Sequence, residues 1–324
     1  MDRPLVGAIR WDAWHGDLDV PGQVMQRTLL PEKYHYRLPY FTKFKPDGSL
    51  SITHITQEEI DEEIKYAKDA GLDYFAFCMY ERGTPLALAR DRYLDSQVEG
   101  KPKWCAILGV NVFPKDEDYE WLCREFEKPQ YLRVAQGRPM MFMFDAQQEH
   151  AEILDRLKKC CADMGIAPPY IAAMGWDAEK IAGTAKIIGA HALSAYCTPG
   201  ENGQSYGEQC AREQDTWKRF KDAGMPVLPW VTTGWDPRPR MDTKTPWVTY
   251  AENSWARVGS PEEIVTQLKS AMAFARSDGC EAEAVLIYAW NEFDEGGWLC
   301  PTLFELERDG GPKRIEALAG VLKE

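Results

Sequence analysis

Eight short apolar runs recur along the chain, and each is nearly continuous in hydrophobic residues instead of alternating with polar ones. Runs of this kind are typical of parallel strands that are buried on both faces. Between them, apolar residues recur every three or four positions, as in amphipathic helices. The runs are Val6–Asp12, Leu72–Tyr80, Trp104–Val112, Pro139–Asp145, Tyr170–Trp176, Ala192–Cys197, Val227–Thr233 and Ala284–Asn291.

The helical segments carry start and stop signals. Ser260, Pro261 and Glu263 form an N-cap, a first-turn proline and a capping-box partner, so they predict a helix over Pro261–Ser277. Thr56 and Glu59 repeat this capping box ahead of a second segment that stops at a glycine. The other predicted helices are Gln57–Ala70, Glu149–Met164, Tyr206–Ala223 and, from weaker patterns, Pro85–Leu94, Tyr119–Leu132, Ala178–Ile188 and Pro312–Leu322.

Eight strands that alternate with about eight helices predict an α/β fold, a (β/α)8 TIM barrel formed by one domain over residues 1–324. A doubly wound sheet is the alternative, but no G-x-G-x-x-G follows the first run. Long loops are expected after strands one and seven, over residues 13–55 and 234–259. Pro229 conflicts with a central strand in the seventh run, so a bulge or a shifted strand is expected there.

Composition narrows the class of protein. The chain has 324 residues with 38 basic and 51 acidic side chains, a net charge of −13, which argues against nucleic-acid and acidic-membrane partners. No apolar run approaches the roughly 18–20 residues that span a bilayer. Nine cysteines, with no C-x-x-C pair, favour a reducing, cytoplasmic compartment. A secreted protein that had lost its signal peptide would look the same.

The predicted strand ends carry carboxylates interleaved with aromatic residues. In a TIM barrel these ends form the active-site face. Aromatic rings pack on the apolar faces of sugars, while carboxylates and amides bind hydroxyls, so the pattern predicts a saccharide site. A bulky barrel core is the alternative for any single tryptophan. The candidate substrate-binding residues are Trp11, Asp12, Trp14, Tyr80, Glu81, Asn111, Asp145, Trp176, Tyr196, Trp235, Asp236, Arg238, Asn291 and Trp298.

Glu292 and Glu295 follow the last predicted strand and are the candidate catalytic residues. In an extended strand their positions lie roughly 10 Å apart. A turn brings them within roughly 5–6 Å, near the carboxylate spacing of retaining glycosidases. Gly296-Gly297 favours a turn there, and so close a pair would keep one carboxyl protonated as the acid. A solvated helix face is the alternative, but a buried strand precedes the pair.

Other charged residues leave alternatives open. Asp145 and Asp236, at the ends of strands four and seven, form a second candidate carboxylate pair. Arg238 and Arg240 are expected either to pair with them or to bind an acidic sugar or phosphate. Asp177 is expected to cap the helix that follows it. The five histidines are scattered without H-x-x-x-H spacing, so no zinc site is expected.

The segment Trp290-Asn291-Glu292-Phe293-Asp294-Glu295-Gly296 resembles the W-N-E-W-x-E-G motif of glycoside hydrolase family 99 and of the related WbsX-like proteins. This resemblance implies a retaining glycosidase on a (β/α)8 barrel, without metal or organic cofactor, acting as an endo-α-mannosidase or endo-mannanase. It also implies that Glu292 acts as a base on the 2-hydroxyl of the substrate, giving a 1,2-anhydro sugar. Glu295 would protonate the leaving oxygen and then activate water.

Three positions depart from the family pattern: Phe293 replaces a tryptophan, Asp294 stands where histidine or alanine is typical, and Cys300 occupies a position often held by glutamate. The sequence thus predicts a glycoside hydrolase that cleaves an oligo- or polysaccharide, with an α-mannoside as one candidate substrate. The alternatives are a glycosyl-transferring protein of surface-polysaccharide assembly and a non-catalytic glycan-binding barrel. Sugar identity, linkage, endo or exo action and oligomeric state stay open.

Overall fold

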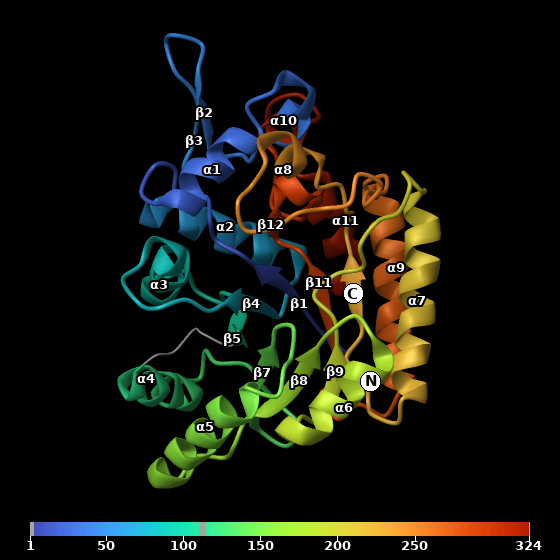
Figure 1. The fold of residues 1–324 in the computed structure, drawn as a ribbon. Coiled ribbons are helices and arrows are strands. Elements are labelled where there is room, and N and C mark those ends of the chain that lie inside the picture. The colour runs from blue at the N-terminus through green and yellow to red at the C-terminus, as the bar shows by residue number, and fades with distance from the viewer. Residues whose placement is uncertain (1–2, 110–114, 324) are drawn as a thin grey trace.

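The structure is a computed structural model that describes residues 3–109 and 115–323. Within these residues, eight parallel strands form the wall of a barrel, in the order β10-β11-β1-β4-β5-β7-β8-β9 (Figure 1). The strands are β1 (Leu5–Arg10), β4 (Tyr74–Cys78), β5 (Lys103–Leu108), β7 (Arg138–Met143), β8 (Tyr170–Met174), β9 (Ala192–Ser194), β10 (Trp230–Thr232) and β11 (Ala284–Tyr288). The predicted single (β/α)8 barrel is confirmed.

The first and last strands of this order meet through a short seam. Leu193 of β9 forms a parallel bridge with Val227, just before β10. Its amide donates to the Pro226 carbonyl at 2.8 Å, and its own carbonyl accepts from the Leu228 amide at 2.8 Å. These bonds join β9 to the chain that leads into β10. The barrel is therefore nearly closed.

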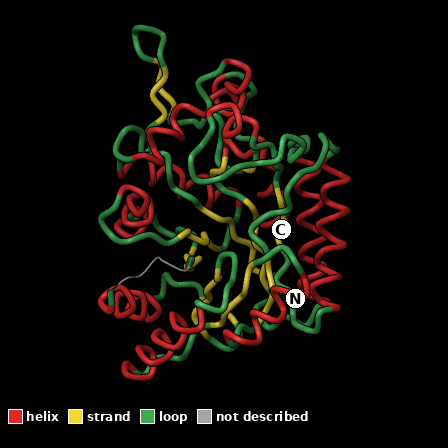
Figure 2. Tube along the Cα trace, in the orientation of Figure 1, coloured by secondary structure: helices red, strands yellow, loops and turns green. Residues whose placement is uncertain are grey.

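Helices cover the outside of the barrel, as the tube view makes clear (Figure 2). The capping boxes at Thr56 and Ser260 form as predicted, and Gly71 ends its helix in the left-handed conformation. The helices that follow barrel strands are α2 (Gln57–Ala70), α3 (Leu88–Asp95), α4 (Asp116–Glu127), α5 (His150–Met164), α6 (Ala178–Ile188), α7 (Tyr206–Asp222), α9 (Pro261–Ser277) and α11 (Lys313–Leu322).

The predicted elements differ from the structure mainly at their ends. The segment predicted as Pro85–Leu94 divides into a 3-10 turn, η2 (Pro85–Ala87), and α3, while α4 begins and ends earlier than predicted. Pro229 precedes β10 and does not interrupt it. Its carbonyl accepts from the Leu286 amide at 3.1 Å, so the proline joins β11 through the one backbone group that it can offer.

The expected long loops after strands one and seven contain small elements of their own. The first carries α1 (Val20–Thr28), η1 (Glu32–Arg37) and the hairpin β2 (Thr42–Phe44)–β3 (Leu50–Ile52), which projects from the barrel in Figure 1. The second carries α8 (Arg238–Thr243). The remaining elements are β6 (Arg133–Val134), β12 (Asn291–Glu292), η3 (Phe293–Glu295), β13 (Gly297–Trp298) and α10 (Leu303–Glu307). Within the described residues, no helix is long and apolar enough to cross a bilayer.

A buried ionic cluster joins the first strand to α2. The Arg10 guanidinium lies 2.6 Å from a Glu63 oxygen and 2.8 Å from an Asp12 oxygen, and all three side chains are buried. The guanidinium also lies over the rings of Phe75 and Phe77. Charges buried this deeply are tolerated only when they are paired, because desolvation of either one alone is costly.

We expect Glu63→Ala to destabilise the fold by about 3–5 kcal/mol, because it leaves the Arg10 charge buried without its closest partner. Urea unfolding followed by circular dichroism measures the change. The triple variant Arg10→Met/Asp12→Asn/Glu63→Leu removes all three charges and should recover much of that loss. As a control, Glu120→Ala removes an exposed ion pair with Arg124 and should cost about 0.5 kcal/mol or less. Equal losses in Glu63→Ala and Glu120→Ala would contradict this account.

Candidate active site

The larger of two described cavities opens at the carboxyl ends of the barrel strands and has a volume of about 740 Å³. Its floor contains Glu292, Glu295 and Arg240. Its walls come from the ends of β1, β4, β5, β7, β8 and β9 and from the loop after β10. This is the face on which TIM barrels build their active sites.

The two glutamates converge because the chain reverses just after β11. Asn291 and Glu292 of β12 pair with Trp298 and Gly297 of β13, and the 3-10 turn η3 connects them. Gly296 ends the turn with φ of +83°, and a Cβ atom there would lie 2.6 Å from the Asp236 amide. Only glycine fits both constraints. The turn expected from the Gly296-Gly297 pair is present.

The turn wraps around a single guanidinium group. Arg240, on α8, lies 2.6 Å from Glu292 through Nη2 and 2.6 Å from Glu295 through Nη1. Its Nε donates to Asp294 at 2.8 Å. The planar fork of arginine presents its donors in fixed directions, so these contacts hold the three carboxylates around one rigid group.

Three tyrosines complete the contacts of the glutamates. Tyr196, after β9, donates its hydroxyl to Glu292 Oε1 at 2.9 Å. Tyr250, from the loop after β10, and Tyr288, the last residue of β11, donate to the two oxygens of Glu295. Both carboxylates therefore accept hydrogen bonds on both oxygens, which fixes their orientation towards the cavity.

The electrostatics of the pair are asymmetric. Burial raises the pKa of Glu292 to about 8, against the opposing effect of Arg240, and the neighbouring charge of Glu295 raises it further. Burial also raises the pKa of Asp294. Glu295 instead accepts from two hydroxyls and one guanidinium nitrogen. With a pKa of about 8, Glu292 is mainly protonated at neutral pH.

Aromatic side chains form the walls of the cavity. Trp11 donates its indole N–H to the Tyr80 hydroxyl at 2.7 Å and packs edge-on against Trp247, with ring centroids 6.0 Å apart. On another side, Phe144 packs edge-on against Trp176. Trp176 and Trp247 are 43% and 39% exposed, so both present ring surface that a ligand could cover.

The sequence-predicted candidates separate into two groups in the structure. Those that line the cavity come from the ends of six different barrel strands or from the segments that follow them. They are Trp11, Tyr80, Trp176, Tyr196, Trp235, Glu292 and Glu295. Asn111 lies outside the described residues.

Four of the other candidates lie behind the cavity and hold the 291–298 turn in place. The Asn291 side chain donates to Asp12 and accepts from the Trp11 amide. Trp14 donates its indole N–H to the Asn291 carbonyl at 2.8 Å. Trp298 stacks on Phe293 beneath the turn. These side chains are committed to structural contacts within the protein.

The remaining candidates also lie off the cavity lining. Asp236 is buried between Arg37 and Arg238 and forms ion pairs with both. Of the two candidate arginines, Arg238 therefore pairs with Asp236, and Arg240 pairs with the two glutamates. Glu81 forms a surface ion pair with Lys115 at 2.6 Å.

Asp145 is exposed and contacts the Gln147 side chain. The structure does not bring Asp145 and Asp236 together at the cavity. Asp177 caps α6 as expected, accepting from the Lys180 amide at 2.8 Å.

Sequence reasoning missed Tyr250 and Tyr288 as members of the site. It named Arg240 as a partner of Asp145 and Asp236 or as a ligand for an acidic sugar or phosphate, whereas the structure pairs it with the glutamates. Tyr288 carried a signal, since it is a polar-tipped residue inside the apolar run that leads to Glu292. Tyr250 and Arg240 lie in the long loop after β10, where no periodicity fixes which side chains face the barrel. Among the residues that the structure describes, no group of three or more His, Cys, Asp or Glu side chains is arranged for a metal ion.

Fold and site together define a (β/α)8 barrel with an aromatic, carboxylate-bearing cavity at its carboxyl face. Its fold is similar to that of the glycoside hydrolase family 99 endo-α-mannosidase from Bacteroides thetaiotaomicron. One structure of that enzyme, in complex with bis-tris-propane, matches with a TM-score of 0.60 at 14% identity, covering 93% of this chain and 88% of the other. A second matches with a TM-score of 0.58 at 14% identity, covering 93% and 89%.

The chain belongs to the family described as "Glycosyltransferase WbsX", whose model matches residues 114–305, more than half of the sequence. That range contains α8 and the 291–298 turn and therefore both the arginine and the glutamates. A comparison with curated proteins gives no match. The resemblance drawn from the Trp290–Gly296 motif is confirmed at the level of family and fold.

The raised pKa of Glu292 predicts a pH-dependent difference in stability between the wild type and Glu292→Gln. The folded pKa of about 8 exceeds the ordinary value of 4.5, so the protonated carboxyl contributes stability that is full below pH 4.5. This contribution is lost as the pH rises through 8. Glutamine cannot ionise, so the variant should gain roughly 4 kcal/mol relative to the wild type between pH 5 and pH 9.

Urea unfolding at both pH values measures this difference. The matched control is Glu120→Gln, whose side chain is exposed on α4, and its stability difference from the wild type should not change with pH. Parallel pH profiles for the wild type and Glu292→Gln would show that the carboxyl is already ionised in the folded protein.

Proposed function

We propose that this protein is a glycoside hydrolase that cleaves a glycosidic bond in an oligo- or polysaccharide with retention of anomeric configuration. The observation that carries the proposal is the convergence of Glu292 and Glu295 on one guanidinium at the floor of an aromatic cavity. Two carboxylates on one sugar-sized, tryptophan-lined site match the requirements of glycoside hydrolysis. Family membership and the shared fold of an endo-α-mannosidase support the same reading and make an α-mannoside the first substrate to test.

The reaction needs one proton donor and one base. In the assignment implied by the family motif, Glu295 protonates the leaving oxygen while the C1–O bond breaks. Glu292 removes the proton of the 2-hydroxyl, whose oxygen closes on C1 as a 1,2-anhydro sugar. Water then opens this ring at C1, giving its proton to Glu295 as Glu292 returns its own to the 2-oxygen. Two inversions at C1 give net retention.

The free protein supports the opposite starting position of the proton. The raised pKa of Glu292 favours a neutral Glu292 in the free protein, whereas the family assignment uses it as the base. Glu292 must therefore either lose its proton before cleavage or act as the proton donor itself. Kinetics can distinguish these two assignments, because only the acid variant depends on the quality of the leaving group.

Glu292→Gln and Glu295→Gln should each lower turnover of a mannan or mannoside substrate by about a thousandfold or more, because each removes one half of the proton-transfer pair. Reducing-sugar release measures activity, and circular dichroism checks folding. Asp145→Asn is the matched control, since that carboxyl is exposed and outside the cavity, and it should retain wild-type activity. Loss of activity in Asp145→Asn, with both glutamine variants active, would show that another pair of carboxylates catalyses the reaction.

The activity of the two glutamine variants on an activated aryl glycoside shows which glutamate is the acid and which is the base. A leaving group that departs without protonation should restore much of the cleavage step to the variant that lacks the acid, but not to the variant that lacks the base. Recovery in Glu295→Gln supports the family assignment. Recovery in Glu292→Gln supports the assignment favoured by the free protein.

The description of the family as a glycosyltransferase makes sugar transfer the second candidate function. We expect hydrolysis without transfer. The test incubates the protein with a radiolabelled sugar nucleotide, with and without an oligosaccharide acceptor, and follows the label by chromatography. Transfer of label to the acceptor by the wild type, but not by Glu292→Gln, would show that the protein transfers sugars instead of hydrolysing glycosides. Calorimetric binding of a glycan that is never cleaved would instead indicate a binding protein.

A further inference from the structure

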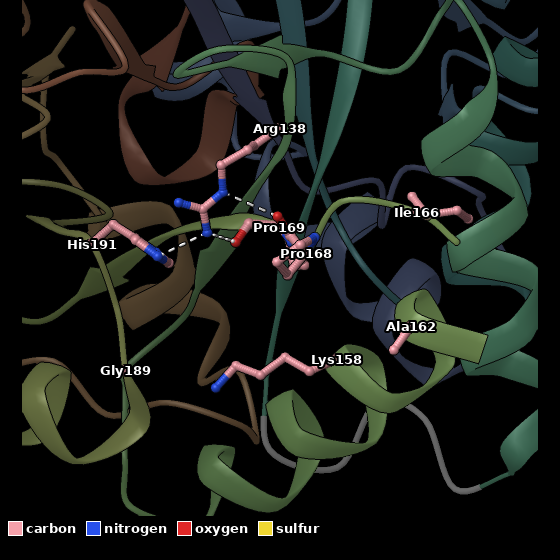
Figure 3. A pocket seen from close by; sticks show the side chains of 8 residues that line it. All are labelled: Arg138, Lys158, Ala162, Ile166, Pro168, Pro169, Gly189 and His191. Atoms are coloured by element: carbon pink, nitrogen blue, oxygen red, sulfur yellow. Dashed lines mark hydrogen bonds between the residues drawn. The ribbon is translucent and has the colours of Figure 1, made fainter. Parts of the chain in front are cut away.

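A second cavity, of about 410 Å³, lies at the opposite end of the barrel from the glutamates. Arg138 is the first residue of β7, Pro168 and Pro169 precede β8, and His191 precedes β9, so they surround the amino ends of these strands. Lys158 reaches the same cavity from α5 (Figure 3). The proposed function makes no use of this cavity.

The polar side chains of this cavity are donors. Arg138 donates to the carbonyls of Pro168 at 3.1 Å and Pro169 at 2.7 Å, and Figure 3 shows its remaining terminal nitrogen directed away from both. Among the described residues, no carboxylate bonds to this guanidinium. The Lys158 ammonium lies 3.6 Å from Asp155, in an exposed pair that contributes little. The cavity thus carries positive charge in a protein of net charge −13.

His191 faces an N–H group on each side of its ring. The Ile171 amide donates to Nδ1 at 3.1 Å. Nε2 lies 2.8 Å from Nη2 of Arg138, which is also a donor. Burial, together with the charges of Arg138 and Lys158, lowers the pKa of His191 to about 4, so the ring is neutral at pH 7. A neutral imidazole has a single acceptor nitrogen, so it can accept from only one of these two donors.

We propose that this cavity binds a small organic oxyanion, a carboxylate or a phosphate monoester, with its charged group on Arg138, His191 and Lys158. An oxyanion can accept from the terminal nitrogen of Arg138 that the proline carbonyls leave unused and from the Lys158 ammonium. Ile166, Pro168 and Pro169 supply the apolar part of the lining, which suits a ligand with a compact apolar body. Arginine is the side chain best matched to the paired oxygens of such an anion.

Isothermal titration calorimetry of the full chain at constant ionic strength tests this site. The probes are phenyl phosphate, benzoate and inorganic phosphate, with benzyl alcohol as the uncharged control. We expect saturable binding of at least one aryl anion, tighter than inorganic phosphate because the ring adds apolar contact, and none of benzyl alcohol. The order of phenyl phosphate and benzoate identifies the preferred anion. Equal binding of benzyl alcohol, or no saturable binding of any anion, would overturn the proposal.

Variants locate the binding. Arg138→Gln should weaken binding about tenfold or more, because a charge-assisted bond is lost. Lys158→Gln leaves the bonds of Arg138 to the proline carbonyls intact and should weaken binding by a smaller factor. This variant therefore tests the site even if Arg138→Gln does not fold. Arg124→Gln, on the exposed face of α4, should bind as the wild type does.

Glu292→Gln alters only the cavity that contains the glutamates, so it should bind these anions as tightly as the wild type does. Wild-type affinity in both Arg138→Gln and Lys158→Gln would show that these cations serve only the protein's own carbonyls. A change of affinity in either direction in Glu292→Gln would place the anion in the other cavity.

Discussion

One buried guanidinium organises the candidate active site. Arg240 contacts Glu292, Asp294 and Glu295, which belong to a single four-residue segment, so the turn that carries the proposed catalytic pair is folded around a cation. Without that charge, three carboxylates would lie buried side by side, and both desolvation and mutual repulsion would oppose the turn. The arginine comes from the loop after β10 and the glutamates from the chain after β11. The site therefore depends on the docking of these two segments.

Much of the barrel could be predicted from the sequence because buried parallel strands and capped helices leave local signals. The eight apolar runs correspond to the eight barrel strands, and the capping boxes at Thr56 and Ser260 mark helix starts to the residue. The turn at Gly296 was also predictable, since glycine is needed where φ is positive. These features depend on neighbours in the sequence, which is the range over which a single sequence is informative.

The sequence could not separate residues that line the cavity from residues that support it. Asp12 and Asn291 follow strands just as Trp11 and Glu292 do, yet they bond to each other behind the site. Which neighbour faces the cavity depends on the stagger and tilt of the strands and on partners that lie far away in the chain, such as Asn291 for Asp12. The position of Tyr250 was hidden for a related reason, because an irregular loop has no period.

The seam between β9 and β10 bears on how the cavity could change shape. These two strands have three residues each and meet at Leu193 through a single bridge and its flanking bonds, whereas β4 and β5 are in register over five residue pairs. Tyr196 follows one side of this seam and the segment carrying Arg240 follows the other. Parting of the wall here would break few backbone hydrogen bonds, together with the bonds of Thr198 to Thr232 and Trp230 across the same seam. Opening of the barrel along this seam would then move Tyr196 and Arg240 apart and change the hydrogen bonds that they donate to Glu292.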